Sequence, residues 1–103
     1  MAILNLTLKK KWFDLIASGQ KTVEYREFKP YWVSRLMANG AIRQDFTEVH
    51  FRNGHSRNAP FIRVKLHSLT VYRKDFIAPM HGEEITADKY FLISLGPVLE
   101  LRA

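Results

Sequence analysis

The amino-acid sequence predicts one small α+β domain, an open β-barrel of about five to six strands with two helices in its N-terminal half. Two observations support this prediction. Apolar and polar residues alternate with the period of a β-strand over most of the second half, whereas helical spacing occurs twice, both times near the N-terminus. The chain has 103 residues, 47% hydrophobic and 25% charged, a composition typical of a single folded domain covering residues 1–103.

The first half of the chain alternates between strand and helix patterns, and its turn-forming residues support this order. Gly19 suits the left-handed position that follows a helix, and Pro30 suits the first turn of the next helix. We expect Asn39-Gly40 to end that second helix. The predicted elements are strands at residues 3–8 and 22–27, and helices at residues 9–18 and from residue 30 onward.

Short strands dominate the second half. Gly96-Pro97 is expected to separate the last two strands as a turn, because proline cannot donate to the hydrogen-bond ladder. Residues 73–89 are predicted as a short helix and an acidic loop. The predicted strands are residues 47–53, 61–67 with a continuation to 72 beyond a bulge, 90–95 and 98–101. The aromatic residues expected in the core are Trp12, Phe13, Phe46, Phe61 and Phe91.

Composition excludes several classes of function. The absence of cysteine rules out disulfide scaffolds, thiolate zinc sites and cysteine nucleophiles. The histidines are not spaced as metal ligands, so we expect neither a metal site nor a cofactor. No stretch approaches the ~20 apolar residues that span a bilayer, and the N-terminus does not resemble a secretory signal. We therefore expect a cytoplasmic protein that does not associate with membranes.

The distribution of charge indicates a partner that carries phosphate. Sixteen lysines and arginines against ten acidic residues give a net charge of +6 and a pI near 9.8. Residues 1–74 carry 14 basic and 5 acidic side chains, whereas residues 75–103 carry 2 and 5. A basic body of this kind is the electrostatic signature of a nucleic-acid-binding protein.

The densest group of functional side chains lies at the junction between the first helix and the second strand. Lys21, Glu24 and Arg26 fall within six residues of one another. A lysine there can hold a phosphate or polarise a carbonyl, and a carboxylate can act as a general base or accept a hydrogen bond from a base amino group. Strict alternation places Lys21 opposite Glu24 and Arg26, so a shared site requires an irregular strand start near Thr22. The alternative is that Glu24 and Arg26 form an ion pair on an exposed face.

These residues resemble the ASCH domain (activating signal cointegrator homology), a small member of the PUA-like superfamily, in its compact bacterial and phage single-domain form. The resemblance implies a PUA-like open β-barrel with a helix between its first two strands, and an RNA-facing cleft walled by that helix. It is carried by Leu6-Thr7-Leu8, Gly19-x-Lys21-Thr22-x-Glu24-x-Arg26, Lys29-Pro30-Tyr31-Trp32, Phe51-Arg52-Asn53-Gly54 and residues 90–96.

The resemblance implies an RNA- or nucleotide-binding module with a basic cleft that contains Lys21, Glu24 and Arg26. Lys21 and Arg26 would contact phosphate, and Glu24 would accept from a base amino group or orient Lys21. An aromatic side chain at the rim would stack on a base. The rim residues implied in the same way are Tyr31, Trp32, Arg52 and Asn53.

Some small ASCH-like proteins resemble amidohydrolases that act on an acylated cytidine, and others are linked to RNA cleavage. The former use a lysine, a threonine three residues later and a distal glutamate. This sequence has Glu24 at the threonine position and Thr22 beside Lys21, with Glu83 or Glu84 as the distal acid. The alternative function is therefore a metal-independent hydrolase of a modified nucleoside or of RNA, with Lys21, Glu24 and Thr22 as catalytic residues.

Two further hypotheses use other parts of the surface. Arg63, Lys65 and His67 form a basic stripe, with His50 and Arg52 on a neighbouring strand. That stripe would follow a phosphate backbone, or it would be a charged face that discourages aggregation. The basic body could equally meet an acidic protein partner, with the acidic C-terminal segment modulating the interaction.

Overall fold

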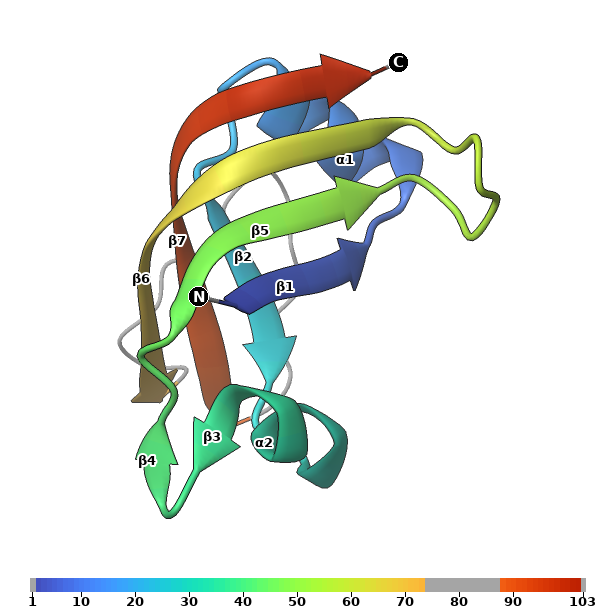
Figure 1. The fold of residues 1–103 in the computed structure, drawn as a ribbon. Coiled ribbons are helices and arrows are strands. Elements are labelled where there is room, and N and C mark those ends of the chain that lie inside the picture. Colours follow the sequence, from blue (N-terminus) through green and yellow to red (C-terminus); the bar gives the residue numbers. More distant parts are fainter. Residues whose placement is uncertain (1, 74–87, 103) are drawn as a thin grey trace.

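The structure is a computed structural model that describes residues 2–73 and 88–102. It contains a curled five-stranded sheet, a separate two-stranded hairpin and two helices (Figure 1). The predicted helix and acidic loop at residues 73–89 fall mostly outside the described residues, as do Glu83 and Glu84. The strands are β1 (Ala2–Thr7), β2 (Val23–Glu27), β3 (Met37–Ala38), β4 (Ala41–Ile42), β5 (Phe46–Arg52), β6 (Phe61–Arg73) and β7 (Lys89–Arg102). The helices are α1 (Lys10–Ala17) and α2 (Pro30–Leu36).

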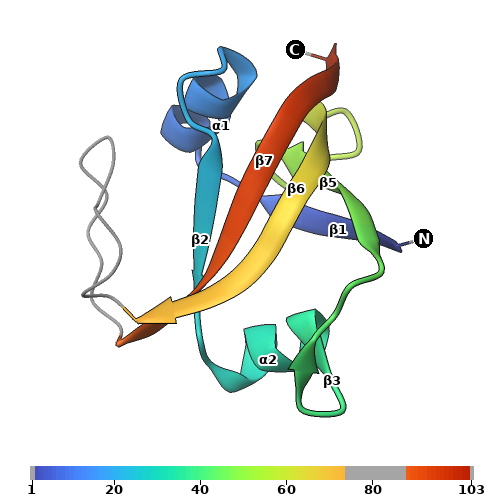
Figure 2. The same ribbon diagram turned by 90° about the vertical axis from the view of Figure 1, so that its left-hand side faces the viewer.

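The five-stranded sheet has the order β1-β5-β6-β7-β2. β1 runs parallel to β5, and the other neighbours are antiparallel. The sheet curls so that its two edge strands, β1 and β2, approach one another and close half of a barrel (Figure 2). The predicted α+β class, the two N-terminal helices and the open, curled sheet are confirmed.

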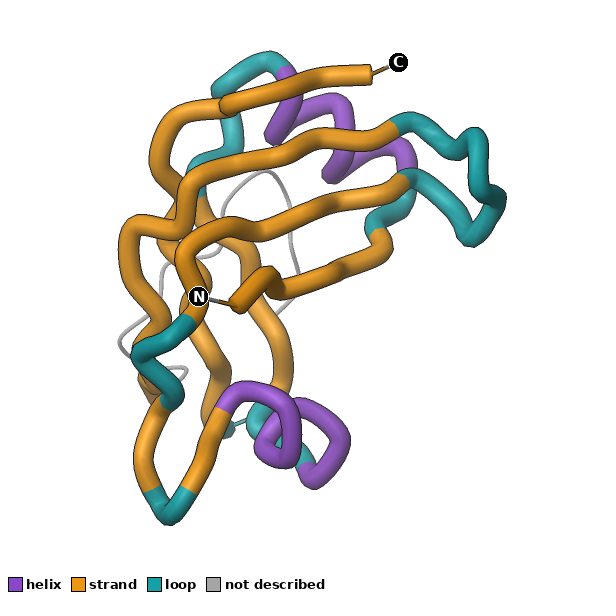
Figure 3. Tube along the Cα trace, viewed as in Figure 1, coloured by secondary structure: helices purple, strands orange, loops and turns teal. Residues whose placement is uncertain are grey.

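The prediction of two strands separated by Gly96-Pro97 is wrong, because β7 continues through both residues. The register shows how: Val64 pairs with Val98 and Leu66 with Leu95, so Gly96 and Pro97 form a bulge. A bulge tolerates proline, since the residue need not donate to the ladder. Bulges also increase strand bending, and both long strands bend sharply along their length (Figure 3).

Asn39-Gly40 does not end the second helix, which stops at Leu36. The two residues form the turn of the β3–β4 hairpin, and their φ angles are +53° and +77°. Positive φ at both central positions is the signature of a type I′ turn, for which Asn-Gly is a preferred sequence. Side-chain alternation does not predict this hairpin, because strands of two residues are too short to show it.

The core lies on the concave face of the sheet, where α1 contributes Phe13 and Ile16 and α2 contributes Leu36. The prediction of a core position is confirmed for Phe13 and Phe91, and Trp12 and Phe46 pack against the same cluster. Phe61 is also buried, but on the opposite, convex face. In the part of the chain that the structure describes, no helix is long and apolar enough to cross a membrane.

Candidate ligand site at the seam of the half-barrel

The candidate site lies where the two edge strands of the half-barrel meet beside α1. We call it the seam site and define it by the charged residues Lys21, Glu24 and Arg26 and the aromatic residues Trp12, Tyr25 and Trp32. Three elements contribute these side chains, namely α1, β2 with the loop before it, and α2.

The loop between α1 and β2 brings Lys21 into the site. Gly19 ends the helix with a φ of +82°, and the amide N–H of Lys21 donates to the carbonyl of Leu15 at 3.0 Å. β2 then begins only at Val23, so strand alternation does not constrain Lys21. The ammonium of Lys21 lies 3.9 Å from Oε1 of Glu24. The irregular strand start that a shared site requires is therefore present.

The Lys21–Glu24 pair is buried, since each residue is only 2% exposed. The Lys21 ammonium also lies 5.2 Å from the ring centre of Trp12 and 5.3 Å from that of Tyr25. Both rings offer the negative face that attracts a cation. Burying two charges carries a large desolvation penalty, which such close partners offset. Glu24 also pairs with Arg26 at 3.3 Å, as the alternative predicts, but Glu24 is buried, so this pair does not lie on an exposed face.

Glu24 and Arg26 together satisfy the backbone of Tyr25 on the edge strand β2. The Tyr25 amide donates to Oε1 of Glu24 at 2.9 Å, and the Arg26 guanidinium donates to the Tyr25 carbonyl at 3.0 Å. The same guanidinium lies 3.3 Å from Oε2 of Glu24. The N–H and C=O of Tyr25 are thus hydrogen-bonded to side chains and are not available to pair with another strand.

Arg26 also reaches across the seam to the opposite edge strand. Its second terminal nitrogen donates to the carbonyl of Thr7 in β1 at 3.4 Å. The guanidinium lies 5.3 Å from the ring centre of Trp32 in α2. The Arg26 side chain is 19% exposed to solvent, whereas the Lys21 side chain is 1% exposed. Arg26 is therefore the charged group at the centre of the site that solvent or a ligand reaches most easily.

The two aromatic residues of α2 differ in accessibility. Trp32 is half-buried against the core, whereas Tyr31 is 52% exposed. The two rings meet edge to face with centres 4.8 Å apart. The guanidinium of Arg35 covers one face of Tyr31 at 3.6 Å from the ring centre. A stacking ligand would therefore meet the uncovered side of Tyr31 or the exposed part of Trp32.

The structure does not bring the other predicted rim residues to the seam. The Arg52 side chain lies on the convex face, where its guanidinium is 4.8 Å from the ring centre of Phe61. The Asn53 amide donates to the carbonyl of Pro60 at 3.0 Å and begins the β5–β6 loop. Thr22 is exposed, and with Lys21 it lines a pocket of about 240 Å³ between the end of α1 and β7.

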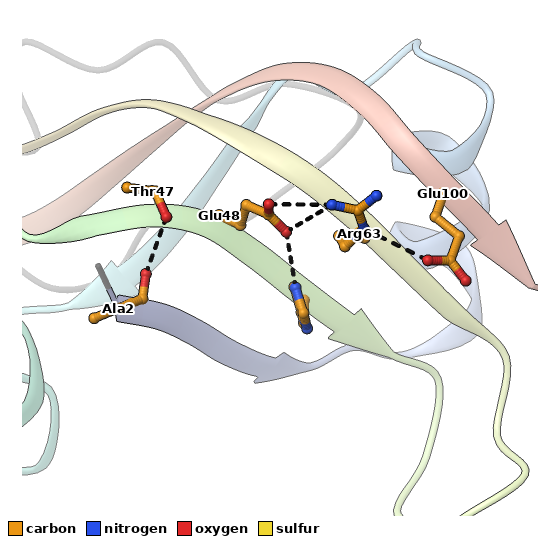
Figure 4. Close-up of polar contacts among 6 residues, drawn as sticks. Ala2, Thr47, Glu48, Arg63 and Glu100 are labelled. Atoms are coloured by element: carbon orange, nitrogen blue, oxygen red, sulfur yellow. Dashed lines mark hydrogen bonds and ion pairs between the residues drawn. The ribbon is translucent and has the colours of Figure 1, made fainter.

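A second group of charges lies on the convex face of β5, β6 and β7 (Figure 4). Arg63 donates to both carboxylate oxygens of Glu48, at 3.1 and 3.2 Å, and lies 3.5 Å from Glu100. His50 lies 3.1 Å from Glu48. The hydrogen bond from His50, followed by that from Arg63, lowers the pKa of Glu48, while desolvation opposes the shift. Arg63 is therefore held by two carboxylates rather than presented to a phosphate backbone.

The predicted basic stripe contains the basic members of this convex network but not its acidic members. Glu48 and Glu100 flank Arg63 on the two neighbouring strands, and this arrangement depends on the strand register. In the predicted stripe, Lys65 and His67 are exposed. Among residues 2–73 and 88–102, no three His, Asp or Glu side chains come together as a metal site would require.

Comparisons with known protein families, with curated proteins and with solved structures found no match to this chain. The class of protein is thus defined by its own geometry, a small α+β half-barrel with a buried charged cluster at its seam.

Proposed function

We propose that this chain is an ASCH-type, PUA-like module that binds RNA or a nucleotide at the seam site. The single observation that carries the proposal is the buried Lys21–Glu24 pair, with Arg26 beside it and aromatic rings around it. Apolar residues of similar size would usually stabilise a fold as well as a buried ion pair does. Charged groups held in such surroundings are enriched at functional sites.

Exposed lysines beside the seam support a phosphate-bearing ligand. Lys9 caps the N-terminus of α1, and Lys10 and Lys11 are its first two residues. The ammonium of Lys11 lies 4.6 Å from the ring centre of Trp12, the ring that also contacts Lys21. These lysines would supply the salt-sensitive attraction to phosphate, and Arg26 would make the directed contact.

Lys21 and Glu24 are buried and would act indirectly, since Glu24 holds Arg26 in place and Lys21 pairs with Glu24. Trp32 and Tyr31 would supply the stacking surface. We prefer binding to hydrolysis because Glu24 is only 2% exposed, and its carboxylate accepts from the Tyr25 amide and lies 3.3 Å from Arg26. A general base must come within hydrogen-bond reach of the proton that it takes.

The proposal is tested by fluorescence titration of labelled single-stranded RNA, duplex RNA and single-stranded DNA between about 50 and 200 mM salt. Arg26→Gln should weaken RNA binding about tenfold or more, because a directed charged contact is worth about 1–3 kcal/mol. Lys11→Gln should weaken binding less and reduce its salt dependence. Arg43→Gln is the matched control, since it removes the same charge from an arginine whose ion pair is with Asp45 rather than with a residue of the seam site.

Equal weakening by Arg26→Gln and Arg43→Gln would reduce the interaction to non-specific attraction. A lack of binding to all three polymers would refute the proposal. If a gel shows that the RNA has been cleaved, the function is hydrolysis rather than binding. Thermal unfolding of each variant shows whether a loss of binding is a loss of folding.

A further inference from the structure

The C-terminal part of β7 has one edge with which no other strand of the described residues pairs. β2 pairs with Tyr90–Ser94 of β7, and the carbonyl of Thr22 accepts from the amide of Leu95 at 2.8 Å. Beyond that point β6 covers one edge of β7 as far as Arg102. On the other edge of residues 96–102, no described strand pairs with β7. Alternate backbone N–H and C=O groups on such an edge are available to another polypeptide.

A pocket opens beside this edge, where an extension of β2 would otherwise lie. β2 does not extend along residues 96–102, because the residues before it form the loop from α1. α1 itself lies near the C-terminal end of β7 (Figure 2). The resulting pocket has a volume of about 240 Å³. Its lining is mainly apolar and includes Ile16 of α1 together with Leu95, Pro97 and Val98 of β7.

Apolar side chains on the edge itself are unusually exposed. Val98 is 39% exposed and Leu101 is 49% exposed. Both pair with concave-face residues of β6, Val98 with Val64 and Leu101 with Ile62, so they point toward the same side as the pocket. Exposed apolar residues on an unpaired strand edge are a hazard unless a partner covers them.

We propose that the edge formed by residues 96–102 binds an extended, apolar segment of a partner protein by β-strand addition. The backbone of the segment would continue the line of β2 along β7, and one apolar side chain would occupy the pocket. This is the mode of recognition in which main-chain hydrogen bonds provide affinity and a side-chain pocket provides specificity. The inference does not rest on the RNA-binding proposal, because it uses the edge of β7 and apolar side chains, although Lys21 of the seam site also lines the pocket.

Chemistry and size favour this occupant over other candidates. A nucleic acid does not present the alternating N–H and C=O groups that a strand edge requires. The cation in the pocket lining, Lys21, is already paired with Glu24, so the pocket offers little to a phosphate. A volume of about 240 Å³ is below the ~300–1,000 Å³ of typical small-molecule pockets and suits one side chain. Seven edge residues are also fewer than the ~20–30 residues a side of a stable dimer interface.

The test begins with selection of random heptapeptides displayed on phage against the whole chain. The selected peptide is then synthesised and titrated into ¹⁵N-labelled protein. We expect selected sequences with apolar residues at alternate positions, and amide shifts concentrated at residues 96–102. N-methylation of the peptide should weaken binding about tenfold or more at one set of alternate positions and little at the other, because only one set faces β7.

Val98→Asp should abolish peptide binding, whereas Ile3→Asp should not. Ile3 is the matched control, an apolar residue of 48% exposure on the edge strand β1. The proposal is overturned if no peptide is enriched, if the shifts lie elsewhere, or if both methylation patterns are tolerated. A dimer that Val98→Asp dissociates would assign the edge to a second copy instead. RNA-induced shifts at the same edge would assign it to nucleic acid.

Discussion

Lys21 and Glu24 form a buried ion pair, whose desolvation is costly and must be offset by neighbouring groups. Neither charge is exposed to water, so each depends on near neighbours for stabilisation. Glu24 has the Tyr25 amide, the Lys21 ammonium and the Arg26 guanidinium within 4 Å. Lys21 has Glu24 and two aromatic rings. Removing one member leaves the other charge buried with less compensation.

We predict that Lys21→Met lowers the free energy of unfolding by about 3 kcal/mol, because it leaves Glu24 buried with Arg26 as its remaining cation. Urea denaturation measures the change. The double variant Lys21→Met/Glu24→Gln should recover much of the lost stability, because it leaves no unpaired buried charge. The side-chain oxygen introduced at position 24 can still accept from the Tyr25 backbone N–H. Lys10→Met is the control, because Lys10 and Asp14 form an exposed pair that contributes little. A Lys21→Met variant as stable as Lys10→Met would contradict this account.

At the scale of elements, side chains from three neighbouring strands interact on the convex face. Arg63 of β6 lies between Glu48 of β5 and Glu100 of β7. Arg102 lies 3.1 Å from Glu100 and 4.4 Å from the ring centre of Phe61. These contacts complement the backbone ladder across all three strands and cover a buried aromatic ring with charged groups.

The titration of Glu48 in this network predicts that the stability of the fold depends on pH. The pKa of Glu48 is lower in the folded protein than its ordinary value of 4.5. Its contacts therefore stabilise the fold above that value, and the contribution disappears as the pH falls through the lower, folded pKa. Wild type should exceed Glu48→Gln in unfolding free energy at about pH 7, and the difference should shrink at about pH 3.5.

Urea denaturation at both pH values checks this prediction. Thr47→Ala is the control on the same strand, since Thr47 has a weak hydrogen bond to the Ala2 carbonyl at 3.5 Å and no charge to titrate. Its effect should be the same at both pH values. A difference between wild type and Glu48→Gln that stays constant, or grows, in acid would contradict the assignment.

At the scale of the whole molecule, Arg26 links the two edges of the curled sheet. Its guanidinium contacts Glu24 and the Tyr25 carbonyl on β2 and the Thr7 carbonyl on β1. A planar group with five donors can make these contacts together, whereas a lysine ammonium cannot reach them all. The seam is thus held by one residue as well as by the core beneath it.

We predict that Arg26→Lys increases amide hydrogen exchange in β1 about tenfold or more, although the charge is unchanged. Exchange in the central strand β6 should change little, because its contacts do not involve Arg26. Arg43→Lys provides the matched control, since Arg43 pairs with Asp45 rather than with a residue of the seam site. Equal exchange in β1 for Arg26→Lys and wild type would show that the core alone holds the seam closed.

Local pattern predicted much of the fold. The helices and most strands follow from side-chain periodicity, and Gly19 and Pro30 mark helix ends through their own backbone preferences. Asn39-Gly40 and Gly96-Pro97 were misinterpreted because the same dipeptides serve helix ends, hairpins and bulges. Which role they adopt depends on the strand that lies opposite.

The sequence by itself determined the α+β class, the basic character of the chain and the proximity of Lys21, Glu24 and Arg26, because these depend on composition and short spacing. Tertiary structure alone decided that Lys21 and Glu24 are buried, that Arg26 joins two strands far apart in the chain, and that Arg52 faces away from them. It also decided that, within residues 2–73 and 88–102, no strand pairs with the outer edge of residues 96–102. Burial, register and edges depend on which segments become neighbours, and no short window of sequence contains that information.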